Sequence, residues 1–106
     1  MNDSSGALSW EDKFCAMQTL DPDISIKMLG SSGLWYVSSS IVYTKAVDRR
    51  VWNNINFCAS TVAEAVAKSW EAVTFPNIIV RVDKDDVLVH KAGVPHQWKK
   101  FMWVKV

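Results

Sequence analysis

The spacing of apolar residues predicts two amphipathic helices. The first begins at Ser9, which can cap the amide of Asp12, and ends at Asp21-Pro22, because proline disfavours helical geometry in the residue before it. The second begins with the capping box Thr61-Val-Ala-Glu64 and ends at Phe75-Pro76. Apolar residues three or four positions apart form the stripes of the two helices: Trp10, Phe14 and Met17, and Val62, Val66, Trp70 and Val73.

The remaining chain alternates with the period of two that is typical of β-strands. In the segment 51–58, one face is apolar and the other carries Trp52, Asn54 and Asn56, so we expect that second face to meet solvent or a partner. The run 78–82 is almost wholly apolar and predicts a central or well-covered strand, whereas residues 92–95 break the pattern. The predicted strands are 24–28, 34–44, 51–58, 78–82 and 87–90, with a final strand over 101–106.

These elements predict an α+β fold. Up to His90 their order is α-β-β-β-α-β-β, and the simplest packing places two helices on one mostly antiparallel sheet. Short, hairpin-like connections favour antiparallel pairing. We expect a flexible tail over 1–8 and a single α+β domain over 9–106.

Composition and charge leave the class of partner open. The chain has 106 residues, a net charge of +1 and six tryptophans, most of which we expect in the core and one or two at a binding face. A charge so near zero favours neither nucleic acid nor a mimic of it. The polar start is not a secretory signal and no apolar run is long enough to span a membrane, so we expect a cytoplasmic protein with Cys15 and Cys58 as thiols.

The sequence lacks a recognisable catalytic or metal-binding set. His90 and His96 are six residues apart across a Gly-Pro break, which matches no common zinc pattern, and neither cysteine has a local partner that would activate it. No phosphate-binding glycine motif is present. We therefore expect no catalytic residues, no metal and no cofactor.

Two stretches are candidates for binding. Aromatic residues interleave with lysines in the segment 96–103, which can serve a protein-binding edge or stack nucleic acid bases, although lysines also protect an ordinary edge strand. A basic turn precedes the strand 51–58. The candidate binding residues are Arg49 and Arg50 in that turn, Trp52, Asn54 and Asn56 on the strand face, and Trp98, Lys99 and Lys100.

Two resemblances add to this interpretation. The predicted order α-β-β-β-α over 9–74 resembles a double-stranded-RNA-binding domain, but Thr61-Val-Ala-Glu64 stands where that family has lysines. Gly33-Leu-Trp-Tyr-Val-Ser-Ser39, Thr61-Val-Ala-Glu-Ala65 with Trp70, and Phe101-Met-Trp-Val104 are similar to segments of small phage-encoded proteins. Many of those proteins are anti-defence factors, including anti-CRISPR inhibitors, and the similarity implies an inhibitor that binds a large host complex.

The leading hypothesis is therefore a non-enzymatic binding protein, encoded by a phage, that inhibits a bacterial defence nuclease by protein–protein contact. Its expected partner is a host protein or ribonucleoprotein complex in the host cytoplasm, with no membrane association. The alternative is a nucleic-acid-binding module with a double-stranded-RNA-binding-like fold. Either function is compatible with a monomer or with a homodimer formed through the aromatic C-terminal strand.

Overall fold

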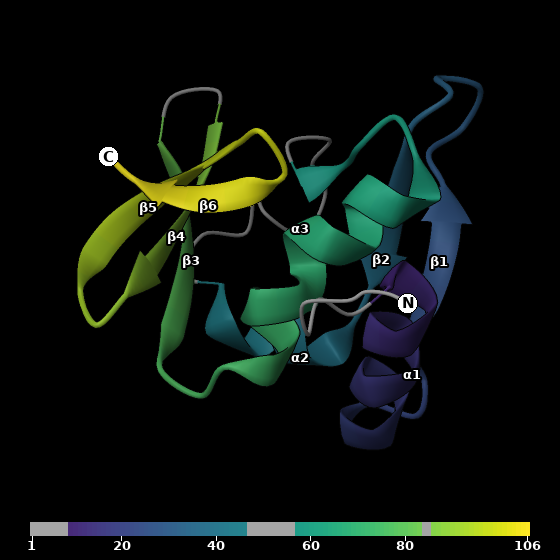
Figure 1. Ribbon diagram of the computed structural model, residues 1–106, viewed down its shortest axis with the longest axis horizontal. Helices are drawn as coiled ribbons and strands as arrows, with labels where there is room; N and C mark the ends of the chain where they lie inside the picture. Colours follow the sequence, from purple (N-terminus) through teal and green to yellow (C-terminus); the bar gives the residue numbers. More distant parts are fainter. Residues whose placement is uncertain (1–8, 47–56, 84–85) are drawn as a thin grey trace.

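The computed structural model of the protein describes residues 9–46, 57–83 and 86–106 (Figure 1). The predicted tail over 1–8 and residues 51–56 of the predicted third strand lie outside the described residues. The helices are α1 (Trp10–Leu20), α2 (Ser40–Lys45) and α3 (Val62–Thr74), and the strands are β1 (Ser25–Met28), β2 (Trp35–Ser38), β3 (Ile78–Asp83), β4 (Asp86–Lys91), β5 (Val94–Lys99) and β6 (Met102–Lys105).

The α+β class and the antiparallel pairing predicted from the sequence are confirmed. The described strands form two sheets rather than one: β1 pairs with β2, and β3-β4-β5-β6 form a four-stranded meander. The strand over 78–82 was expected to be central or well covered. It is β3, an edge strand of this meander, so it is not central, although Ile78 and Val80 are buried on its inner side.

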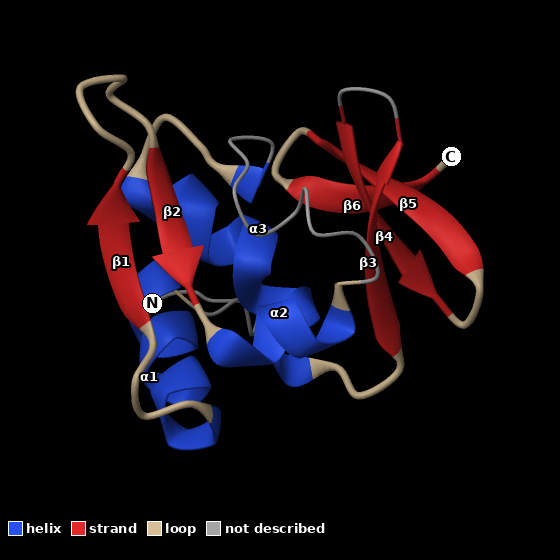
Figure 2. Cartoon of the chain, turned by 180° about the vertical axis from the view of Figure 1, so that it is seen from behind, coloured by secondary structure: helices blue, strands red, loops and turns tan. Residues whose placement is uncertain are grey.

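Helix α3 occupies the centre of the molecule. It lies between the meander on one side and α1 with the β1–β2 sheet on the other (Figures 1 and 2). Thr61 caps the start of the helix as predicted, because its hydroxyl accepts from the Glu64 amide at 3.2 Å. Facing two layers, α3 buries more of its circumference than a surface helix does. Its buried residues are Ala65, Val66, Lys68, Ser69, Ala72 and Val73.

A short helix replaces the end of the strand predicted over 34–44. Strand β2 ends at Ser38, and α2 begins at Ser40. The carboxylate of Asp21, at the end of α1, accepts from the Ser39 hydroxyl at 2.9 Å and from the Ser40 amide at 3.1 Å. The Ser39 hydroxyl in turn accepts from the Ile41 amide at 3.2 Å. These bonds satisfy amides at the start of α2 and outweigh the strand preference of its β-branched residues.

Residues 92–95, expected to break the pattern, instead form a tight hairpin that leads into β5. Ala92 and Gly93 both have positive φ, 52° and 81°, as a two-residue hairpin turn of the favoured type requires. Pro95 lies within β5, where its carbonyl accepts from the Val106 amide at 3.1 Å. Proline has no N–H to donate, so one hydrogen bond is missing from the β5–β6 ladder. Because Pro95 lies at the end of that ladder, the loss weakens the pairing only slightly.

Candidate binding surface

The meander has one covered face and one open face. Along β3, Ile78 and Val80 are buried against the core, while Ile79 is 42% exposed and Arg81 is exposed. This alternation is the ordinary period of a strand with one face on a core. In both ribbon views the three described helices lie on one side of the meander, and none of them covers the other side (Figures 1 and 2).

We call the open side the outer face. The strand register places the side chains of Ile79 and His90 opposite each other, and those of Arg81 and Leu88 likewise. Apolar and polar groups therefore mix across neighbouring strands. The outer face includes Ile79, Arg81, Asp86, Leu88, His90, Pro95, Gln97, Met102, Val104 and Val106.

A depression of about 350 Å³ lies at the β3–β4–β5 part of this surface. Arg81 and His90 line it together with Leu88, Pro95 and Val82, of which Val82 turns its side chain to the core. Within the described residues, no ion pair or hydrogen bond engages the Arg81 guanidinium. An apolar depression beside an unengaged guanidinium suits a partner that offers an apolar side chain next to an acceptor.

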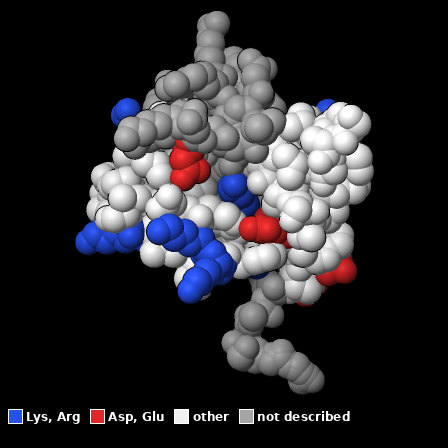
Figure 3. Space-filling model, turned by 90° about the horizontal axis from the view of Figure 1, so that it is seen from above, with Lys and Arg blue, Asp and Glu red and all other residues white. Residues whose placement is uncertain are grey.

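The surface charge is mixed. The space-filling view from above shows a group of basic side chains in one area and acidic side chains elsewhere around a central hollow (Figure 3). At the outer face itself, Asp86 accepts from the Gln97 amide group at 3.2 Å, which places an acidic residue two positions from Leu88 on the same strand. Among the described residues of this face, Arg81 and His90 alternate with apolar residues and do not form the continuous basic stripe that is usual for a nucleic-acid-binding surface.

Trp98 lies on the inner face of the meander and is half-buried. Its indole N–H donates to Glu64 Oε2 at 2.8 Å, and its ring meets Trp103 edge-on at a centroid distance of 5.2 Å. The Trp103 indole donates to the Lys68 carbonyl at 3.0 Å. These contacts hold β5 and β6 against α3, so the structure gives Trp98 a packing role.

Lys99 and Lys100, in contrast, are exposed at the β5–β6 hairpin. Lys100 and Phe101 form its two-residue turn with φ values of 50° and 66°, and the Phe101 side chain is 53% exposed. The structure thus brings two of the predicted binding residues together with an exposed aromatic ring. Arg49, Arg50, Trp52, Asn54 and Asn56 lie outside the described residues, and their roles stay predictions.

Lys68 is buried on α3, which is unusual for a lysine. Its ammonium donates to the Cys58 carbonyl at 3.3 Å. Burial lowers the pKa of Lys68, while the nearby charges of Asp86, Glu64 and Cys58 raise it in part. Burial likewise raises the pKa of the Cys58 thiol, with Lys68 opposing that shift. A thiol held in its neutral form is a poor nucleophile, which does not favour covalent chemistry at Cys58.

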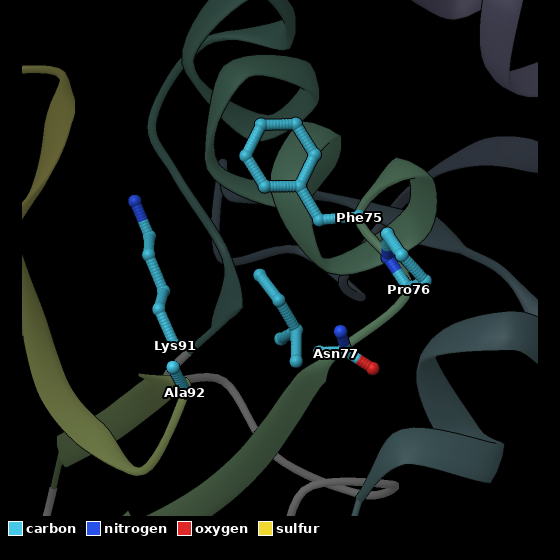
Figure 4. A pocket seen from close by; sticks show the side chains of 6 residues that line it. Phe75, Pro76, Asn77, Lys91 and Ala92 are labelled. Carbon is cyan, nitrogen blue, oxygen red and sulfur yellow. The ribbon is translucent and has the colours of Figure 1, made fainter.

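A second, smaller depression lies at the end of α3. It measures about 210 Å³, and Figure 4 shows Lys91 across from Phe75, Pro76 and Asn77. Lys91 forms an ion pair with Glu71, which engages its ammonium. This depression therefore offers a partner less unengaged charge than the one at Arg81.

The histidines do not converge. His90 lies on the outer face, whereas His96 pairs with buried Val89 on the inner face and its Nδ1 lies 2.8 Å from the Val94 carbonyl. Over residues 9–46, 57–83 and 86–106, no group of three or more His, Cys, Asp or Glu side chains is placed to hold a metal ion. Nor does that part of the chain contain a helix long and apolar enough to cross a membrane.

No protein-family model, curated protein or solved structure matches this chain. Sequence reasoning missed the outer face, although the signal was present: the pattern Ile78-Ile-Val-Arg-Val82 places a charge at one of its alternate positions, which indicates that one side of the strand is open.

Proposed function

We propose that this chain is a small non-enzymatic binding protein that docks on a protein partner through the outer face of its meander. The observation that supports this most strongly is the open apolar surface itself. Ile79, Met102 and Val104 are 42%, 58% and 38% exposed and share one sheet face with Arg81, whose guanidinium has no ion pair or hydrogen bond to any described residue. Exposed apolar side chains that alternate with polar groups on an open sheet face are a common feature of protein interaction sites, and arginine is enriched at their centres.

The dimensions of the sheet indicate how far the contact extends. Four strands spaced by about 4.8 Å and about six residues long measure on the order of 15 by 20 Å, which is small beside the roughly 800 Å² that each partner buries in a standard interface. The contact must therefore continue onto neighbouring surface. The β5–β6 hairpin adjoins the outer face, and its exposed Lys99, Lys100 and Phe101 are the natural extension.

The proposed partner is a bacterial defence nuclease complex, which the chain inhibits as phage-encoded anti-CRISPR proteins do. This part of the proposal comes from the resemblance of Gly33–Ser39, Thr61–Ala65 and Phe101–Val104 to small phage proteins. The outer face is consistent with this proposal, because an inhibitor that is not an enzyme must act by binding and needs a surface that can cover a site on its target.

The test uses two double variants matched in charge. Ile79→Glu/Arg81→Glu changes the outer face, whereas Leu20→Glu/Lys27→Glu makes the same change of charge at exposed positions of α1 and β1, on the other side of the molecule. In bacteria with an active defence nuclease, we expect the wild type and the α1/β1 variant to raise the plaquing efficiency of a sensitive phage and to co-purify with the nuclease. The outer-face variant should do neither.

If the wild type protects no phage and holds no nuclease, the inhibitor proposal fails. If both double variants act like the wild type, the protein binds elsewhere and the outer face is not the site.

Nucleic acid binding remains a second candidate because of one observation, the β5–β6 hairpin tip. There an exposed phenyl ring follows two exposed lysines, the combination that stacks a base and contacts phosphates. This function predicts that single- or double-stranded RNA or DNA binds with an affinity that falls steeply with salt, and that Phe101→Ala weakens it. Absence of binding, or binding insensitive to salt, would rule it out.

A further inference from the structure

Strand β6 is an open edge of the meander. The strand order β3-β4-β5-β6 leaves both outer strands with one unpaired side, but β3 is partly covered, because Val80 forms a parallel bridge with Ala46. Among the described residues, β6 pairs with β5 alone. In Figure 1 the β6 ribbon lies in front of the other strands of the meander. An open edge offers a row of main-chain donors and acceptors to another strand.

The hairpin register shows which groups point outward. Lys99 pairs with Met102 across a two-residue turn, and the Val106 amide donates to the Pro95 carbonyl. Main-chain groups of an antiparallel strand point alternately to its two sides, so Met102, Val104 and Val106 turn theirs towards β5. The N–H and C=O groups of Trp103 and Lys105 therefore point away from the sheet, at the open edge.

We propose that β6 pairs antiparallel with β6 of a second copy, around a two-fold axis that passes Val104. In this register, Trp103 and Lys105 exchange main-chain hydrogen bonds with Lys105 and Trp103 of the partner subunit. On the outer face Val104 meets its own equivalent, and Met102 meets Val106 of the partner subunit. These three side chains are 38%, 58% and 69% exposed in the monomer.

Neighbouring registers are worse. A shift of two residues in one direction places Lys105 opposite Lys105 of the partner subunit, which brings like charges together. The opposite shift requires Phe101, which lies in the turn with a φ of 66° and cannot continue a strand. A shift of one residue sets outward-pointing groups against inward-pointing ones and forms no ladder. Self-complementarity around Val104 therefore selects a second copy as the occupant of this edge.

The pairing is short, so the dimer is weak. Five residues from each copy bury far less than the roughly 1,600 Å² of a standard interface, which places the dimer among concentration-dependent assemblies. Its consequence is geometric: two four-stranded meanders become one continuous eight-stranded sheet. The two outer faces then lie side by side on one surface and can engage two sites of a symmetric partner.

Sedimentation velocity over a concentration series from about 10 µM to about 1 mM tests the proposal, because a weak dimer appears only towards the upper end. We expect the wild type and Ile79→Glu to dimerise as concentration rises, since Ile79 shares the outer face but lies on the far strand. Val104→Glu and Val104→Lys should each stay monomeric, and an equimolar mixture of the two should dimerise again, because position 104 faces itself. A wild type that stays monomeric, a Val104→Glu variant that still dimerises, or a mixture that does not recover would each overturn it.

Cysteine crosslinking tests the register even if a charged variant misfolds. In a Cys15→Ser background, which removes the exposed native thiol, Val104→Cys should form a disulfide-linked dimer readily, because the two Cβ atoms of a directly opposed pair lie about 5 Å apart. Met102→Cys should crosslink with Val106→Cys in a mixture but not with itself. Strong self-crosslinking at position 102, or none at position 104, would contradict the proposed axis.

Discussion

Replacing Asp21 with alanine tests why the chain turns into α2 after Ser38. Asp21 is 6% exposed, and its carboxylate accepts from the Ser39 hydroxyl and the Ser40 amide, and from the Asp23 amide at 3.2 Å. The variant therefore removes the acceptor on which the start of α2 depends, while α1 keeps its own helical bonds.

The expected loss follows from these bonds. A hydrogen bond to a charged group contributes about 1.5 to 3 kcal/mol, and a buried donor left without a partner costs about 1 to 3 kcal/mol. Ser39 is only 2% exposed, so water cannot easily replace the carboxylate there. Allowing for relaxation, we expect Asp21→Ala to lower the free energy of unfolding by about 3 kcal/mol, which for a domain of this size lowers Tm by roughly 12 to 24 °C.

Urea unfolding followed by tryptophan fluorescence gives this difference. Asp21→Asn keeps one carbonyl acceptor and should lose about half as much. The matched control is Asp23→Ala, because the Asp23 side chain is exposed and should contribute less than about 0.5 kcal/mol. If Asp21→Ala were no less stable than Asp23→Ala, the carboxylate would not be what fixes α2.

The remaining predictions concern the inner side of the meander. The pKa of Lys68 is lowered by burial, so the unfolded chain holds this proton to higher pH than the folded one. Hence the free energy of unfolding should rise as the pH approaches 10.5. Lys68→Met should make this rise with pH smaller when stability is measured by urea unfolding at several pH values. An equal rise in the variant would contradict a lowered pKa for Lys68. Trp98→Phe should lower stability by about 1 kcal/mol by removing the bond to Glu64, and a double-mutant cycle with Glu64→Ala should show coupling of similar size. Additive effects would mean that the bond contributes nothing.

The elements predicted correctly are those whose signals are local. Ser9 caps the Asp12 amide at 3.2 Å and Thr61 caps Glu64, as the spacing of these residues indicated. The spacing of apolar residues predicted helices α1 and α3, with apolar positions three or four residues apart. The alternation of apolar and polar residues predicted the hairpin of β1 and β2 and the last strand. Such signals depend only on neighbours in sequence and need no knowledge of the fold.

The predictions were wrong where contacts with residues distant in sequence determine the local conformation. Helix α2 depends on Asp21, eighteen residues before Ser39, and no local pattern reveals that contact. Strand β5 was missed because Ala92 adopts positive φ, which is uncommon for alanine and is imposed by the pairing of the flanking strands. The role of Trp98 could not be read from the sequence either, because alternation places a tryptophan on a face without saying which face α3 covers.

The candidate surface was only partly predictable for the same reason. Lys99 and Lys100 were expected at an exposed edge and are exposed at the β5–β6 hairpin. The outer face, however, is assembled from four strands, and its apolar character appears only once the register is known. Ile79 and Val104 are 25 residues apart in sequence and share this face through pairings that no single segment encodes.

The most direct test of the outer face as the binding surface is methionine oxidation in the complex with the captured nuclease, at a concentration where the chain is monomeric. Met102 is 58% exposed on the outer face, Met28 is 49% exposed on β1, and buried Met17 serves as the unreactive reference. Peptide mass spectrometry after brief peroxide treatment reports each rate. We predict that binding slows oxidation of Met102 at least several-fold and leaves Met28 unchanged. Equal oxidation of Met102 in the presence and absence of the partner, with Met28 protected instead, would place the interface on the other side of the molecule and contradict the account.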